Sequence, residues 1–128
     1  MQFQIIAAVA CGGALGAVGR HLWVAQVAQW AGHGFPFGVL TANILGSFAM
    51  GVIVELGALA WSPSPELRAF LTVGVLGAFT TFSTFSMDTV LLYERGAYLQ
   101  CAGYIVASVV LSVGAFFLAL ALLRAVLA

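Results

Sequence analysis

Charged residues are almost missing from this sequence. Its 128 residues contain four Arg, no Lys and four acidic side chains, which together make up 6% of the chain. A soluble domain of this length needs a largely polar surface, because a small domain leaves much of its chain exposed. With so few charged residues, this chain cannot form such a surface, which excludes a soluble domain. Nucleic-acid binding is also excluded, since neutralising phosphates takes a basic patch that four scattered Arg cannot supply.

Cysteines and clusters of metal-ligating residues are also scarce. Cys11 and Cys101 lack the CxxC spacing of redox and zinc sites, and both fall within apolar stretches. We expect them to be small packing residues. His21 and His33 have no acid or thiol at metal-ligand spacing, and no Ser-His-Asp set can be assembled. The sequence therefore does not predict an enzyme.

Hydrophobic residues make up 63% of the chain, which excludes a disordered acidic protein and predicts an integral membrane protein. A helix needs about 20 apolar residues to span a bilayer, and Gly32–Pro36 divides the longest charge-free stretch with a loop. We expect an all-α fold in one transmembrane domain, residues 1–128. Its four spans are predicted at residues 3–25, 37–60, 67–92 and 97–124.

The four Arg are divided equally between the two sides of the membrane. With four spans, Arg68 and Arg124 lie on the side of both termini, and Arg20 and Arg95 lie on the other side. Orientation normally follows an excess of Lys and Arg on the cytoplasmic side, and this chain has no such excess. Either four charges are too few to decide the orientation, or copies insert both ways and pair as an antiparallel homodimer.

Polar residues within spans face a helix bundle or a wet cavity and are candidate functional residues. Asn43 lies well inside the second span, one turn before Ser47 on the same face. Its amide can form an interhelical hydrogen bond or offer an N–H to a permeating anion, and the sequence leaves both alternatives open. Small residues four apart predict close helix packing. These pairs are Gly12 and Gly16, Ala42 and Gly46, and Ser47 and Gly51.

The third span has weak helix formers at its middle. They are Gly74, Gly77 and the run Thr80–Ser86. We expect a broken helix near residues 77–81, where freed carbonyls can hold a cation and freed N–H groups can hold an anion. Phe82 and Phe85 project from one face of the helix that follows. Their positive ring edges can attract an anion, and packing against lipid or core is an equal alternative.

The fourth span carries one polar stripe, because Tyr104, Ser108 and Ser112 recur at every fourth residue. The serines can bond to carbonyls of their own helix, or the stripe can line an ion path. Among the charged residues, Arg20 can snorkel and Asp88 lies near a span end, and either can guard a vestibule. Glu55 is close enough to the end of the second span to be expected at the surface.

Together these residues resemble the Fluc (CrcB-type) fluoride channel family. The matching segments follow one another along the chain as Gly12–Arg20, Gly38–Ser47 and Gly74–Ser86, and Thr80–Phe85 is the most specific of their strings. The sequence departs from the family pattern at two positions. Asp88 stands where Glu is usual, and Val39 stands where Thr is common.

The resemblance implies a fluoride-selective channel in the cell (inner or plasma) membrane, which lets fluoride leave the cytoplasm passively. It also implies a dual-topology, antiparallel homodimer with two pores and a structural sodium ion at its centre. By motif position, fluoride would meet Asn43, Phe82 and Phe85, and Arg20 would lie at the vestibule. Tyr104, Ser108 and Ser112 would form the polar track. Backbone carbonyls of Gly77 and Thr80 would hold the sodium ion.

Two other classes of membrane protein compete with a channel. A small dual-topology multidrug exporter needs a carboxylate within the membrane to exchange protons for a cationic drug, and the first span has no acidic residue. A non-transporting assembly subunit would account for the small-residue packing faces. It would not account for the Thr80–Phe85 string or for Asn43.

Overall fold

Four helical segments make up the computed structural model, which describes residues 2–127; Met1 and Ala128, at the ends of the predicted domain, lie outside these residues. Each segment is long and apolar enough to cross a membrane, and the described residues contain no strand. The predicted all-α class is confirmed. The elements are α1 (Gln2–Ala31), α2 (Phe37–Leu59), α3 (Pro65–Ala69), the π-helical η1 (Phe70–Leu76), α4 (Gly77–Phe79), α5 (Phe82–Glu94) and α6 (Tyr98–Leu127).

Turn residues end and start these helices as local chemistry requires. Gly32 and Gly96 both have φ of 82°, a left-handed conformation that glycine adopts without strain, and they follow α1 and α5. At the start of α3, the hydroxyl of Ser64 accepts a hydrogen bond of 3.2 Å from the N–H of Leu67, and Pro65 occupies the first turn. The loops are short, and segments that follow one another in the chain run in opposite directions.

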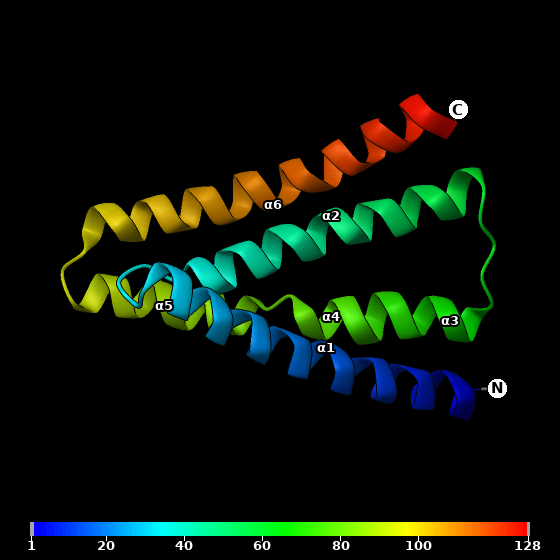
Figure 1. Ribbon diagram of the computed structural model, residues 1–128, viewed down its shortest axis with the longest axis horizontal. Helices are drawn as coiled ribbons and strands as arrows, with labels where there is room; N and C mark the ends of the chain where they lie inside the picture. The colour runs from blue at the N-terminus through cyan, green and yellow to red at the C-terminus, as the bar shows by residue number, and fades with distance from the viewer. Residues whose placement is uncertain (1, 128) are drawn as a thin grey trace.

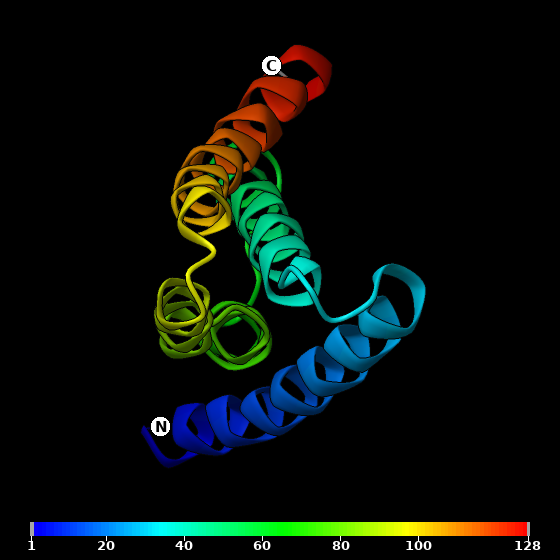
Figure 2. The ribbon, with the colours of Figure 1, turned by 90° about the vertical axis from the view of Figure 1, so that its left-hand side faces the viewer.

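The termini and the loop 60–64 lie at one end of the molecule, and the loops 32–36 and 95–97 lie at the other (Figure 1). Seen end-on, α2 lies between α6 on one side and α1 on the other (Figure 2). α2 packs mainly along α6, and α1 packs mainly along η1 and α4. The α3–α5 segment thus passes between α1 and the α2–α6 pair, and it contacts all three.

Small residues allow the helix crossings to be close. A Cβ atom added at Gly12 would lie 3.0 Å from the Cα of Gly74 in η1, so only glycine fits this crossing of α1. On α2, a Cβ at Gly51 would lie 2.8 Å from the Cβ of Ala119 in α6. Ala42 is fully buried. The packing role predicted for these small-residue positions is confirmed.

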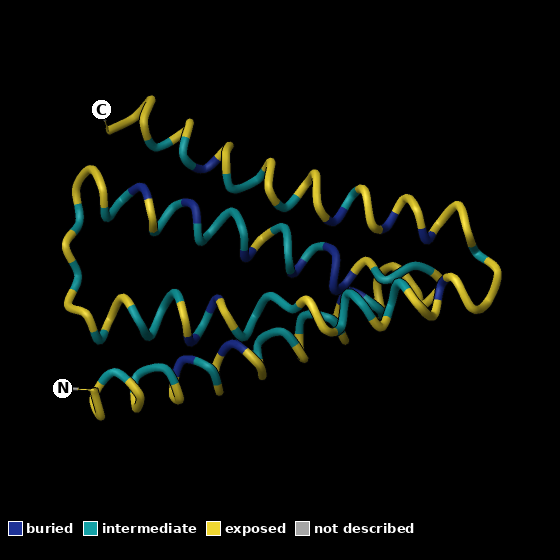
Figure 3. The backbone as a smooth tube through the Cα atoms, turned by 180° about the vertical axis from the view of Figure 1, so that it is seen from behind, coloured by how far each residue is buried: buried dark blue, intermediate teal, exposed yellow. Residues whose placement is uncertain are grey.

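Few side chains are buried, and most helical turns carry exposed residues (Figure 3). The exposed side chains are largely apolar, as expected for helices that face lipid. The main buried cluster joins Leu40, Leu92, Cys101 and Tyr104. Cys101 therefore packs internally as predicted, whereas Cys11 is exposed on α1 and the prediction is wrong for it.

Glu55 is buried, and the prediction that it lies at the surface is wrong. Its side chain is 7% exposed, and its Oε2 atom lies 3.1 Å from Nη2 of Arg124 on α6. The reason is the close α2–α6 crossing, in which Gly51 lets α6 lie over the next turn of α2. Proximity to a helix end did not reveal this cover, because it depends on a helix about 70 residues later in the chain.

Candidate functional site

The helical backbone of the third segment is interrupted at Thr80 and Thr81. Thr80 has φ −84° and ψ 154°, and Thr81 has φ −152° and ψ 126°, which are extended conformations. Helix resumes at Phe82, where the hydroxyl of Thr81 accepts a hydrogen bond of 3.1 Å from the N–H of Thr84. The Thr-rich run therefore supplies its own cap for α5.

Asn43 of α2 binds this extended segment through two hydrogen bonds. The N–H of Thr81 donates to Oδ1 of Asn43 at 2.8 Å, and Nδ2 of Asn43 donates to the carbonyl of Thr81 at 3.2 Å. The interhelical bond that the sequence left open is thus present. An amide NH₂ group has two hydrogens, so one N–H of Asn43 remains for another acceptor.

The interruption also frees backbone carbonyls. In a continuous α-helix, the N–H of Thr81 would donate to the carbonyl of Gly77, and the N–H of Thr84 would donate to that of Thr80. Here those two N–H groups donate instead to side chains, at Asn43 Oδ1 and Thr81 Oγ1. The carbonyls of Gly77 and Thr80, both candidate residues from the sequence, therefore lose their helical donors.

A cavity of about 470 Å³ lies beside the interruption. It brings together seven of the residues that the sequence singled out, from α2, α4, α5, α6 and the interruption itself, and no charged side chain lines it. These residues are Asn43, Gly77, Thr80, Phe82, Phe85, Ser108 and Ser112. Tyr104 and Arg20 lie outside its lining.

Two hydroxyl groups in this cavity have no protein partner. The Oγ atoms of Ser108 and Ser112 are buried, and neither has a hydrogen-bond partner among residues 2–127. The alternative in which both serines bond to carbonyls of their own helix is therefore wrong for this arrangement. Buried polar groups are normally hydrogen-bonded, whereas these two hydroxyls are unsatisfied within the described part of the single chain.

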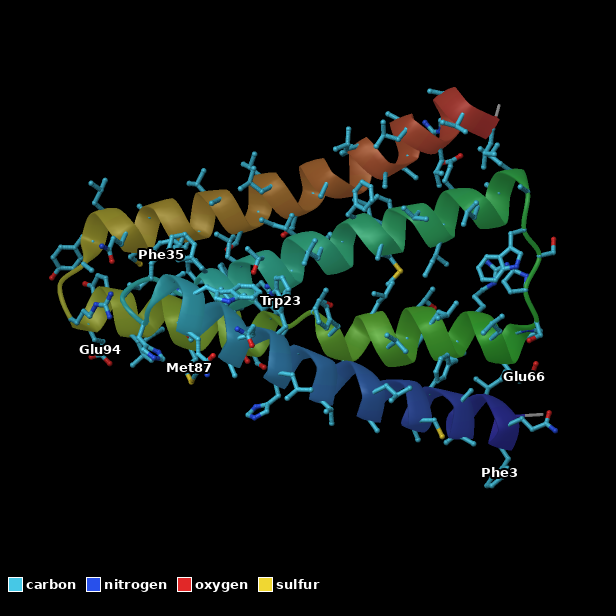
Figure 4. The ribbon with its side chains drawn as sticks, in the orientation of Figure 1. Phe3, Trp23, Phe35, Glu66, Met87 and Glu94 are labelled. Carbon is cyan, nitrogen blue, oxygen red and sulfur yellow. The ribbon has the colours of Figure 1, made fainter. Side chains whose placement is uncertain are left out.

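Aromatic rings form a row from the cavity into the core. Phe82 is 78% exposed, and its ring centroid lies 5.4 Å from that of Phe85. The ring of Phe85 lies 5.2 Å from that of the fully buried Tyr104. Phe35, labelled in Figure 4, meets Tyr104 edge-on at 5.5 Å. Its place in the row was not predicted, because only tertiary packing brings the first loop to α6.

Two further hydrogen bonds place the remaining candidates. The hydroxyl of Tyr104 donates to Oδ2 of Asp88 at 3.1 Å. Nη1 of Arg20 donates to Oγ1 of Thr84 at 3.2 Å, and Arg20 and Thr84 line a separate cavity of about 240 Å³. The roles of Thr81 and Thr84 were missed, although a Thr directly before a helical run is a possible helix cap.

A metal site of the usual side-chain type is absent from the described residues. No group of three or more His, Cys, Asp or Glu side chains gathers anywhere between residues 2 and 127. A cation beside the interruption would therefore meet carbonyl and hydroxyl oxygens, which suit hard cations.

Residues 7–120 match the family model described as CrcB-like protein, Camphor Resistance (CrcB). The chain belongs to this family. The match extends from α1 to the last turns of α6 and includes all the site residues described above. The resemblance drawn from the Thr80–Phe85 string is confirmed.

Three proteins whose names describe a fluoride channel are similar over nearly the whole chain. A protein of Rhodospirillum centenum named "Fluoride-specific ion channel FluC" is 55% identical over 125 residues, which are 98% of this chain and 99% of its own. Proteins of the same name are 45% identical in Nitrobacter winogradskyi, over 98% of this chain and 100% of theirs, and 53% identical in Agrobacterium fabrum, over 93% and 95%.

Family and fold together place the chain in a membrane. It is a multi-pass membrane protein of an ion-channel family, as predicted, and it is not an enzyme.

Proposed function

We propose that this chain forms a fluoride-selective channel that lets fluoride leave the cytoplasm passively. The observation that carries the proposal is the uncharged cavity with the unpartnered hydroxyls of Ser108 and Ser112. Asn43, which has one amide N–H without a partner in its two bonds to Thr81, and Phe82 line the same cavity. The names of the relatives point to the same ion.

The chemistry of this cavity suits a small, strongly hydrated anion. A selective path must replace the water around fluoride with several donors, and it must release the ion again. Hydroxyl, amide and ring-edge donors are each weaker than a guanidinium. Because no Arg or Lys lines the cavity, an anion can pass without being trapped.

We propose that the partner of this subunit is a second copy of the same chain in the opposite orientation. Such an antiparallel homodimer would contain two pores. Phe82 is 78% exposed on the single chain although it borders the cavity. The two-against-two division of Arg gives neither orientation an advantage. A copy inserted the other way would cover this face, and non-helical backbone at membrane depth is tolerated only where protein or a cavity covers it.

A structural sodium ion fits between such subunits. The freed carbonyls of Gly77 and Thr80 are hard oxygen donors, and carbonyls of an unwound helix are known Na⁺ ligands. Bound there, the ion would supply a positive field that favours anions nearby and would bond the two subunits together. Within one subunit, Gly46 lets α2 lie against Thr80, because any Cβ at this position would collide with the side chain of Thr80.

The competing exporter and assembly-subunit hypotheses are weaker. No carboxylate lines the main cavity, so a proton-coupled exporter would lack its exchange site. Asp88 is bonded to Tyr104 and Glu55 to Arg124. A non-transporting subunit would have no use for buried hydroxyls without partners.

Fluoride efflux from liposomes that contain the purified protein tests the proposal. A fluoride electrode should record efflux, and a chloride electrode should record none under the same gradient. Absence of fluoride flux, or chloride flux of equal size, would reject the proposed function.

Two variants test the site itself. Phe82→Ile and Asn43→Asp should suppress fluoride flux while the protein stays assembled on size-exclusion chromatography. Phe3→Ile is the matched control, because Phe3 is 80% exposed and points away from the other helices at the start of α1 (Figure 4). Normal flux through both site variants would show that the pore assignment is wrong.

A further inference from the structure

A continuous set of hydrogen bonds joins Arg20 on α1 to Thr81, the residue whose backbone binds Asn43. Nη1 of Arg20 donates to Oγ1 of Thr84, and Oγ1 of Thr81 donates to the same oxygen, both at 3.2 Å. The N–H of Thr84 returns a bond of 3.1 Å to Oγ1 of Thr81. The backbone N–H and carbonyl of Thr81 then hold both ends of the Asn43 amide.

Oγ1 of Thr84 is the acceptor in both hydroxyl bonds of this set. A guanidinium only donates, so Oγ1 of Thr84 must accept from it, and this oxygen also accepts from Thr81. A hydrogen bond from a charged donor is stronger than one between neutral groups. Arg20 therefore fixes the side chain of Thr84, which in turn fixes the hydroxyl of Thr81 beside the extended backbone.

Arg20 exerts this restraint from outside the main cavity. It lines the separate cavity of about 240 Å³ with His21, Val24, Val39 and Thr84. None of these five residues lines the cavity that contains Asn43 and Phe82. The hydrogen-bonded route from Arg20 to Asn43 therefore runs through Thr84 and Thr81.

We propose that Arg20 is a positioning residue for Asn43, acting through the hydroxyls of Thr84 and Thr81 to hold the interrupted backbone and to aim the free amide N–H into the cavity. The flux readout rests on the proposed channel function. A second readout, described below, does not.

Thr84→Val separates positioning from charge, because it removes the acceptor of Arg20 and leaves the guanidinium in place. We expect about a tenfold lower fluoride flux at saturating fluoride, the cost of a hydrogen bond to a charged group. Thr84→Ser keeps the hydroxyl and should retain most of the flux. The matched control is Thr72→Val, because the hydroxyl of Thr72 bonds only to the carbonyl of Arg68 in its own helix.

A double-mutant cycle tests whether Arg20 and Thr84 act together. Arg20→Met with Thr84→Val should lower the saturating flux no further than the worse single variant. If Arg20 acted only by its charge, Thr84→Val would conduct normally. The Arg20→Met defect would then vanish at high fluoride and would depend on ionic strength. Either result would overturn the proposal.

Hydrogen exchange at the N–H of Thr81 provides the readout that needs no flux. This group donates to Asn43 in the intact site, so NMR should find it protected in the wild type and in Thr84→Ser. Its exchange should be about tenfold faster in Thr84→Val. Unchanged exchange in Thr84→Val would overturn the positioning role, whereas loss of wild-type flux with this protection pattern intact would reject only the channel function.

Discussion

Glu55 on α2 and Arg124 on α6 form an ion pair whose two members are buried very unequally. Their Oε2 and Nη2 atoms lie 3.1 Å apart, and the side chains are 7% and 61% exposed. Loss of Arg124 would leave a buried carboxylate without a partner, which is costly in a low-dielectric environment. Loss of Glu55 would leave a guanidinium that water and lipid headgroups can solvate.

The two charge-removing variants should therefore differ in stability. We expect Arg124→Gln to lower the free energy of unfolding by roughly 3–5 kcal/mol, and Glu55→Gln to lower it by about 1 kcal/mol or less. Denaturant unfolding in detergent micelles measures both, with the exposed Glu94→Gln as a control. Equal losses in the two variants would contradict the unequal burial of the pair.

The crossing of α1 over η1 should tolerate no side chain at Gly12. A Cβ there would lie 3.0 Å from the Cα of Gly74, and overpacking of this kind costs about 1–3 kcal/mol. Gly13→Ala is the matched control, because a Cβ at Gly13 meets no atom within 4 Å. Alanine there should raise helix stability by up to ~1 kcal/mol. Similar unfolding curves for Gly12→Ala and Gly13→Ala would disprove this packing.

Sodium should stabilise the assembled protein if the carbonyls of Gly77 and Thr80 bind it. Replacing Na⁺ with N-methylglucamine should lower the melting temperature in detergent, since a ligand at 100 times its Kd contributes about 2.7 kcal/mol. Restored Na⁺ should restore both stability and fluoride flux. If K⁺ at the same concentration restored stability equally well, a selective sodium site would be excluded.

The equal division of Arg should make orientation easy to bias. Ser62→Lys adds a positive charge to the loop 60–64, and Gly34→Lys adds one to the loop 32–36 at the opposite end. A C-terminal reporter should appear on both sides of the membrane for the wild type. It should appear mainly inside for Ser62→Lys and mainly outside for Gly34→Lys. One-sided insertion of the wild type would contradict dual topology.

Local chemistry made part of the site predictable. The spacing of Ser108 and Ser112 places both hydroxyls on one helix face whatever the helix packs against. Weak helix formers around Thr80 indicated where regular hydrogen bonding would be lost. Both features depend on residues within a few turns of each other, and a single sequence records such relationships directly.

Relationships between distant segments were less accessible. The partner of Asn43 is the backbone of Thr81, 38 residues later. Nearly every residue has the same backbone N–H and carbonyl groups, so the sequence does not indicate which of them a side chain will bind. The π-helical turns of Phe70–Leu76 likewise have no residue signature, because the same residues form ordinary α-helices elsewhere. Burial of Glu55 required the path of α6, which only the folded chain defines.

The open cavity beside Thr80 and Thr81 bears on how the protein is maintained in cells. Each backbone group left without a partner in hydrocarbon costs several kcal/mol, so a solitary chain that exposes this cavity to lipid has a strong drive to associate. For the proposed pair, dilution across a large membrane would then release few single subunits. The number of working units would follow the amount of protein synthesised, even at very low abundance, and would not depend on crowding in the membrane.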